Sequence, residues 1–267
     1  MTFWRQTGVL VLASLVTGTA PRIAASDLCG TTVLADLTLD HDLTCSGNGL
    51  IAGADGITLD LNGYTITGPG SGVGISVPNR TGVVIVGGTV RNFLAGVQLV
   101  NSTGVVVKAG RFTGNQDGIF LIGAVGSTIK ENVASQNSRV GVMLRPSGIR
   151  TSTDNLVAEN MLLDNTNGMI LVETPTRNMI RENTIAGSST AGISVNGGVS
   201  ANVIQENLFI GNAAGIRLNP GAMGLFPTGN SVLENRIVVN TCGIQGPPGD
   251  NVFNENVFKG NVADSCL

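Results

Sequence analysis

The stretch that decides the fold is Asn202-Val203-Ile204-Gln205-Glu206-Asn207-Leu208-Phe209-Ile210-Gly211-Asn212. Its central Glu-Asn pair recurs along the chain at Glu131-Asn132, Glu159-Asn160, Glu182-Asn183, Glu206-Asn207, Glu234-Asn235 and Glu255-Asn256. A further Asn stands five residues after the paired Asn in every copy but one, where Ser188 takes its place. Self-similarity at a period of about 20–50 residues is the signature of a solenoid. The repeat therefore predicts one elongated unit rather than several globular domains.

Each repeat opens on a glycine and contains three short strands. The opening glycines are Gly74, Gly96, Gly118, Gly141, Gly168, Gly192, Gly215 and Gly243. An alternating run such as Ile193-Ser194-Val195 follows each of them, which predicts a strand with one buried face. A second strand ends at the Glu-Asn pair and a third ends at the next Asn, so each repeat predicts one rung of a parallel β-helix. The middle residues of the first strand should point outward: Ser76, Gln98, Phe120, Met143, Ile170, Ser194 and Arg217.

The recurring asparagines have a structural explanation. A sharp corner between strands calls for a left-handed backbone, which Asn tolerates better than most residues. An Asn amide carries both donors and an acceptor, and neighbouring rungs lie about 4.8 Å apart. We therefore predict that the asparagines occupy the corners and form hydrogen-bonded ladders along the solenoid.

The first residues have the order of a secretory signal peptide. Arg5 precedes the apolar run from Val9 to Val16, and small residues lead to Ala25. The run is shorter than the roughly 20 residues that span a bilayer, so we predict cleavage after Ala25 and export to the periplasm or the extracellular space. An uncleaved membrane anchor is the alternative. The division is then a signal peptide at 1–25, an N-terminal cap at 26–48 and a β-helix at 49–267.

The charge balance limits the partners. Without residues 1–25 the chain has 13 Lys and Arg residues against 18 Asp and Glu residues. This mildly acidic composition argues against nucleic acid and anionic membrane as partners.

If the protein is exported, its four cysteines can be expected to form disulfides. Cys29 and Cys45 lie near the start of the predicted mature chain, and Cys242 and Cys266 near its end. A solenoid holds its two ends far apart, whereas a disulfide needs Cα atoms within about 7 Å. The predicted pairs are therefore Cys29–Cys45 and Cys242–Cys266, each closing a terminal coil. Free thiols or a metal site are the alternatives.

The repeat phrases resemble those of secreted right-handed parallel β-helix proteins, in the pectate-lyase-like superfamily with repeats of the NosD type. The stretch from Asn202 to Asn212 carries the resemblance, as does Thr58-Leu59-Asp60-Leu61-Asn62-Gly63 near the head of the chain. The resemblance implies an all-β, single-stranded right-handed solenoid of about ten rungs. It implies little about activity, because the shared motif belongs to the scaffold.

The family's enzymes suggest where chemistry would lie. Its polygalacturonases use a Gly-His-Gly phrase and its alginate epimerases an Asp-Pro-His phrase, and neither occurs here. A lyase of the pectate type needs acidic residues that hold Ca²⁺ and a basic residue that abstracts a proton. The candidates on the first-strand face are Arg145, Arg217, Glu173 and Asp117, although no motif joins them.

The repeated glutamates are a second candidate site. If the rungs stack in register, Glu131, Glu159, Glu182, Glu206, Glu234 and Glu255 form one row. Two exposed carboxylates 4.8 Å apart repel by about 0.9 kcal/mol in water. Ca²⁺ would relieve that repulsion, since this cation prefers oxygen ligands. A solvated acidic stripe is the alternative.

The sequence thus predicts an exported, non-catalytic β-helix that presents an elongated surface to glycan or to an envelope protein. The alternative is a lyase or uronate epimerase that acts on an acidic polysaccharide.

Overall fold

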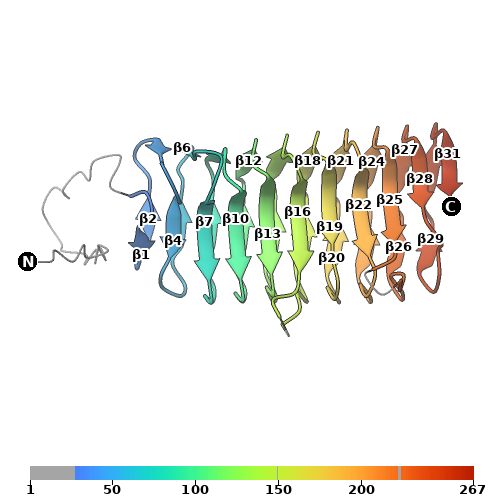
Figure 1. The fold of residues 1–267 in the computed structure, drawn as a ribbon, viewed down its shortest axis with the longest axis horizontal. Helices are drawn as coiled ribbons and strands as arrows, with labels where there is room; N and C mark the ends of the chain where they lie inside the picture. The colour runs from blue at the N-terminus through green and yellow to red at the C-terminus, as the bar shows by residue number, and fades with distance from the viewer. Residues whose placement is uncertain (1–27, 149, 222–223) are drawn as a thin grey trace, which may run out of the picture.

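The structure is a computed structural model, and it describes residues 28–267 apart from 149, 222 and 223. The described chain winds into a solenoid whose three faces are parallel β-sheets (Figure 1). The blue first strands and the red last strands lie at opposite ends of the rod. This confirms the predicted all-β solenoid of about ten turns. The predicted signal peptide, residues 1–25, lies outside the described residues.

The first sheet, sheet A, has 11 strands and faces the viewer in Figure 1. Its strands in spatial order are β1 (Thr32–Val33), β4 (Leu50–Ala52), β7 (Val73–Pro78), β10 (Ala95–Val100), β13 (Asp117–Ile122), β16 (Val140–Arg145), β19 (Asn167–Leu171), β22 (Ala191–Asn196), β25 (Ala214–Asn219), β28 (Cys242–Gln245) and β31 (Ala263–Cys266).

Two shorter-stranded sheets close the other faces, and each has 10 strands. Sheet B contains β2 (Leu37–Thr38), β5 (Thr58–Asp60), β8 (Val84–Val86), β11 (Val106–Lys108), β14 (Thr128–Lys130), β17 (Leu156–Ala158), β20 (Met179–Arg181), β23 (Val203–Gln205), β26 (Ser231–Leu233) and β29 (Val252–Asn254). Sheet C contains β3 (Leu43–Thr44), β6 (Thr65–Thr67), β9 (Thr89–Arg91), β12 (Arg111–Thr113), β15 (Val133–Ser135), β18 (Met161–Leu163), β21 (Thr184–Ala186), β24 (Leu208–Ile210), β27 (Arg236–Val238) and β30 (Val257–Lys259).

The core is a stack of inward residues in strict register. Ile119 lies beside Val142, which lies beside Met169, and each contributes a fully buried side chain. Sheets B and C each contribute the central residue of every three-residue strand, such as Ile180 and Ile185. Since every rung buries its apolar face only between its neighbours, the rungs stabilise one another rather than folding alone.

Three amide ladders run along the corners of the C-terminal rungs. They comprise Asn155, Asn178, Asn202, Asn230 and Asn251; then Asn132, Asn160, Asn183, Asn207, Asn235 and Asn256; and finally Asn115, Asn137, Asn165, Asn212, Asn240 and Asn261. Side-chain amides within them donate to the next amide oxygen at 2.9–3.1 Å. The predicted asparagine ladders are confirmed. Ser188 interrupts the third ladder, and its buried hydroxyl has no partner among the described residues.

We predicted that the ladder asparagines themselves adopt the left-handed backbone, and this prediction was wrong. The residue before the Asn takes the left-handed backbone instead, as in Gln136 with a φ of 55° and Asp164 with a φ of 54°. All six repeated glutamates do the same, with φ between 54° and 58°. The reason is that the left-handed residue turns outward, whereas the following residue points inward and can bond to the next rung. Asn therefore occupies the buried position for its amide, not for its backbone tolerance.

The repeated glycines are required by a close approach of backbones. A Cβ at Gly141 would lie 2.7 Å from the carbonyl oxygen of Gly168, and one at Gly118 would lie 2.5 Å from that of Gly141. A side chain at any rung of this column therefore pushes the sheet A strands apart.

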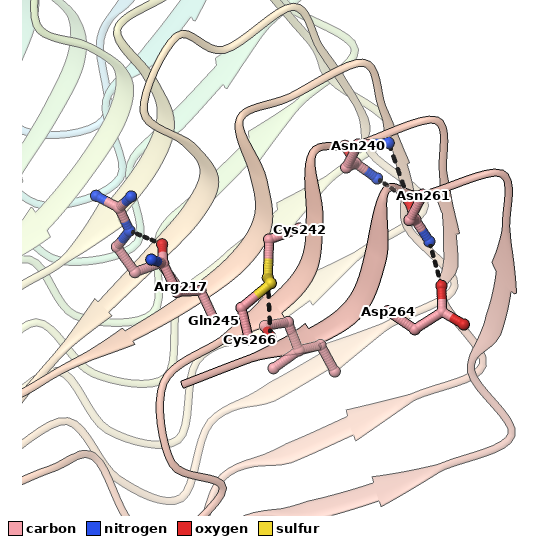
Figure 2. Close-up of a disulfide and its surroundings, with 8 residues drawn as sticks. Arg217, Asn240, Cys242, Gln245, Asn261, Asp264 and Cys266 are labelled. Carbon is pink, nitrogen blue, oxygen red and sulfur yellow. Dashed lines mark hydrogen bonds between the residues drawn. A yellow bond between two sulfur atoms is a disulfide. The ribbon is translucent and has the colours of Figure 1, made fainter.

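Both predicted disulfides are present and are confirmed. Cys29 bonds to Cys45 in the first rung, and Cys242 bonds to Cys266 across β28 and β31. The predicted cap, as far as it is described, carries β1, β2 and β3 and so forms the first turn of the solenoid. Figure 2 shows the second disulfide on sheet A at the C-terminal end.

Candidate functional site

The outward side of sheet A, here called the outer face, is the surface with the most varied chemistry. The column predicted to point outward does lie there, but three members are not free: Phe120, Met143 and Ser194 are exposed by only 8%, 7% and 6%. Their own neighbours on the face cover them. The outer face is therefore a packed layer of side chains above the sheet, not a row of isolated ones.

An apolar cluster occupies the middle of the outer face. Phe120, Val140 and Met143 pack together, with Ile170 partly buried against them. This cluster is separate from the core inside the solenoid. Its partly buried members Ile122, Ile170 and Val172 give the centre of the face an apolar surface that can pack against the CH groups of a ligand.

An ion pair borders this cluster at the amino ends of the strands. The Arg139 guanidinium donates from Nε to Oδ1 of Asp117 at 2.6 Å, and a second bond joins its Nη2 to Oδ2. Asp117 is buried, and its hydrogen bonds raise the pKa of Arg139. The guanidinium carbon also lies 5.7 Å from the centre of the Phe120 ring. Both charges of this pair are therefore engaged.

A polar cluster lies on the outer face toward the C-terminal end. Asn219 donates from Nδ2 to Ser194 Oγ at 2.9 Å and to Asn196 Oδ1 at 2.8 Å. On the same strand as Asn219, Arg217 lies beside Ser194 in register and donates from Nε to Oε1 of Gln245 on the next rung at 2.6 Å, as Figure 2 shows. The bond orients the Arg217 side chain along the face and uses only one of its five N–H donors. Its two terminal nitrogens make no hydrogen bond within the described residues.

Further arginines follow the carboxyl ends of the sheet A strands. Arg145 is exposed at the end of β16. Arg150 folds back toward earlier rungs and donates to the carbonyl oxygen of Asn101 at 2.7 Å and to Thr103 Oγ1 at 2.7 Å. Arg80 follows β7 along the same edge. None of the three makes an ion pair with a described carboxylate. This edge of the face therefore carries three arginines without an ion-pair partner, together with one exposed carboxylate, Glu173.

The four catalytic candidates are not brought together. Asp117 begins β13 and Arg145 ends β16, so the register separates them by about 16 Å along the strands. Arg217 lies three rungs from Arg145, on β25. Glu173 is exposed after β19 with a φ of 71°. Arg217 is the candidate with partners that suit a binding role.

The glutamate column lies on the corner between sheets B and C, away from the outer face. All six glutamates are exposed and stack rung above rung. Lys130 bonds Glu131 at 2.8 Å and lowers the pKa of that carboxyl, and Arg181 pairs with Glu182. Gln205 donates to Glu206 at 3.1 Å. Within the described ranges no three His, Cys, Asp or Glu side chains are grouped as a metal site would require.

Several residues of the outer face were missed by sequence reasoning. Arg139 and Arg150 stand outside the strands of the repeat, and only folding brings them to the face. Asn196 and Asn219 could have been found, because both occupy the last position of the first strand in consecutive rungs. Gln245 was likewise detectable as the partner of Arg217 in register.

Known structures resemble this chain closely in fold but share little of its sequence. The chain is similar to the periplasmic alginate epimerase, with a TM-score of 0.69 and 16% identity over 85% of this chain and 61% of that one. It is also similar to a hyperthermoactive exopolygalacturonase from Thermotoga maritima, with a TM-score of 0.67 and 12% identity over 90% and 78%.

A third similar structure is the Dettilon tailspike protein, with a TM-score of 0.62 and 20% identity over 88% of this chain. The chain spans 57% of the length of that tailspike. No curated protein sequence matches. The family model of the right-handed β-helix region matches residues 48–209, and the chain therefore belongs to the right-handed β-helix family.

Proposed function

We propose that the protein binds an acidic polysaccharide along the outer face of sheet A. The observation that carries the proposal is the polar cluster in which Gln245 positions Arg217 beside Ser194, Asn196 and Asn219. A guanidinium with free terminal nitrogens suits a carboxylate, and the hydroxyl and amide groups beside it suit sugar hydroxyls.

The distribution of charge supports an anionic ligand. Arg80, Arg145 and Arg150 line one edge of the face without a paired carboxylate and outnumber the single exposed Glu173 there, while Asp117 is neutralised by Arg139. The repeated glutamates lie on a different corner of the solenoid, so they do not repel a ligand on this face at close range. An overall acidic chain can therefore still present a locally basic surface.

The shape of the face supports a polymer rather than a small molecule. Rungs repeat at about 4.8 Å, close to the length of a sugar residue, so successive sugars can meet equivalent positions on successive rungs. The apolar cluster around Phe120 and Met143 lies between the arginine edge and the Asp117–Arg139 pair, and its partly buried members Ile122, Ile170 and Val172 offer a surface for the CH faces of the sugars. Similar structures include enzymes named for polysaccharide substrates, an alginate epimerase and an exopolygalacturonase.

The proposed location is outside the cytoplasm, in the periplasm or the extracellular space. Two disulfides favour an oxidising compartment. No helix in the part of the chain that the structure describes could cross a bilayer. An acidic polysaccharide of the cell envelope or its surroundings is the ligand class that such a location would supply.

The test is calorimetric titration with polygalacturonate, alginate and neutral dextran, with and without Ca²⁺. We expect salt-sensitive binding to an acidic polymer and none to dextran, because screening weakens exposed charge pairs. Arg217→Ala should weaken the binding about tenfold, the usual size of a lost charge-assisted contact.

The matched control is Arg236→Ala, which removes an exposed arginine from sheet C in the same part of the rod. Equal weakening by both variants would mean that net charge alone drives binding and would contradict a site on sheet A. Analysis of the incubated polymers for unsaturated or epimerised sugars tests the lyase or epimerase alternative in the same samples.

A further inference from the structure

A polar hollow lies on the corner between sheets C and A, over the rungs of β9, β12 and β15. This open hollow has a volume of about 340 Å³, near the lower end of the range of small-molecule sites. It is distinct from the arginine edge, which lies at the opposite ends of the sheet A strands. None of its lining residues is charged.

The hollow exists because one side chain is missing from a column. Asn92, Gly114 and Gln136 stand at the same corner of three consecutive rungs, each with a left-handed φ of 61°, 64° and 55°. The glycine leaves a gap between two amide side chains, whose backbones are about 9–10 Å apart because two rung spacings separate them. A Cβ at Gly114 would meet no atom within 4 Å, so nothing from the surrounding chain fills the gap.

Other glycines in the same column do not create an equivalent site. A Cβ at Gly187 would lie 2.4 Å from Oδ1 of Asp164, so that carboxylate leans over the gap. Gly211 has open space, but its column neighbours are Gly187 and Val239, which offer no amide. The combination of a gap with flanking amides is therefore specific to Gly114 within the described column.

The lining chemistry fits a neutral, hydroxyl-rich ligand. Gln116 and Gln136 are exposed, and neither side chain makes a hydrogen bond to a described residue, so each amide offers two donors and an acceptor. Leu94, exposed by 47%, adds an apolar surface at the rim. No lining residue carries a positive charge, so a carboxylate would gain no ion pair in the hollow, and the lining favours a neutral sugar over an acidic one.

We infer that this hollow binds one neutral hexopyranose unit, as a free sugar or as part of a glycan. Its ring would lie in the gap above Gly114, with hydroxyls bonded to the amides of Gln116 and Gln136 and a CH face against Leu94. The inference rests on the lining of the hollow and stands independently of the acidic-polysaccharide proposal.

The experiment follows the side-chain amide signals of Gln116 and Gln136 by NMR in ¹⁵N-labelled protein. The probes are the methyl pyranosides of glucose, galactose and mannose, with tri-alanine as a peptide probe. We expect saturable shifts with at least one sugar and a dissociation constant on the order of millimolar, since the site is open and makes few contacts.

Gly114→Gln should fill the hollow and weaken the sugar at least tenfold. Gly211→Gln is the matched control, because its backbone has the same φ of 64° and the same open space outside the hollow. Loss of binding in the first variant alone supports the inference. No saturable shift with any of the sugars, shifts with tri-alanine alone, or equal binding by both variants would overturn it.

Polygalacturonate binding by Gly114→Gln separates this inference from the proposed function. Unchanged binding of the acidic polymer together with loss of the neutral sugar places the two ligands at separate sites. Loss of both would overturn the independence of the hollow from the arginine face.

Discussion

The first rungs and the later rungs solve the same problem at their corners in opposite ways. Every corner leaves a backbone N–H that needs an acceptor from a neighbouring rung. In the first rungs an exposed side chain of the earlier rung accepts from the later one, as Asp42 does from the N–H of Thr65 at 2.8 Å. In the later rungs the direction reverses, and a buried side chain of the later rung accepts, as Asn160 does from the N–H of Asn132 at 3.0 Å.

The difference shows how burial selects the residue type. Three aspartates, Asp36, Asp42 and Asp55, and one asparagine, Asn48, serve the exposed corners, where water solvates the rest of the side chain. A buried carboxylate would lose that solvation, so the later corners use neutral acceptors, mostly the amide of Asn and at Ser127 and Ser152 a hydroxyl. The amide also donates to the next rung, which an aspartate cannot do, and each corner thereby becomes part of a continuous ladder.

The largest expected effect comes from breaking a ladder in its middle. Asn183→Ala removes the acceptor for Asn160 and the donor to Asn207 and to the carbonyl oxygen of Val157. We expect the free energy of unfolding to fall by about 3–5 kcal/mol, because several buried polar groups lose their partners. Urea unfolding followed by circular dichroism measures the change.

The control for this comparison is Asp42→Ala at an exposed corner, with an expected loss of about 0.5–2 kcal/mol, as for other exposed side-chain caps. Equal losses from the two variants would show that burial does not distinguish the two kinds of corner.

The column of glycines runs through both the first rungs and the later rungs. We expect substitution of these glycines to destabilise the protein by a similar amount in each region. Gly74→Ala and Gly141→Ala both place a Cβ against the next backbone carbonyl, at 2.6 and 2.7 Å. We expect each to lower the free energy of unfolding by about 1–3 kcal/mol through overpacking. Gly47→Ala, whose Cβ would meet nothing within 4 Å, should change the urea midpoint little. A large loss from Gly47→Ala would argue against close approach as the cause.

A smaller effect should follow from repairing the interrupted ladder. Ser188→Asn would give Asn165 an acceptor and Asn212 a second donor, as in the rungs on either side. We expect a gain of about 1 kcal/mol in the free energy of unfolding. Ser188→Ala only removes an unpartnered hydroxyl and should be nearly neutral, so equal gains from the two variants would contradict a repaired ladder.

The smallest effect concerns the exposed corner between sheets B and C. The hydrogen bond from Lys130 lowers the pKa of Glu131, so the pair stabilises the fold above the unfolded pKa of that carboxyl and the contribution is lost as pH falls through the folded pKa. Lys130→Met should raise the pKa of Glu131 in an NMR titration. The pKa of Asp154, which the hydrogen bond from Arg177 lowers, should stay unchanged. A Glu131 titration identical in the variant would show that Lys130 does not pair with it in solution.

Much of the fold was predictable because the repeat is local. The glycine-led strand, the strand that ends at the Glu-Asn pair and both disulfides follow from spacing along the chain. The site was less predictable, since its parts come from positions with no repeat. Arg150 reaches rungs that precede it by more than 40 residues, and Arg139 pairs with Asp117 from a turn.

The sequence by itself determined the solenoid, its register and the asparagine columns, because a period of about 23 residues lets each side chain meet its own equivalent on the next rung. Only the tertiary structure decided which corner residue is left-handed, that Phe120 and Met143 are covered, and that Gly114 lies between two amides. Those properties depend on the packing of side chains between rungs, and no single repeat contains both partners of such a contact.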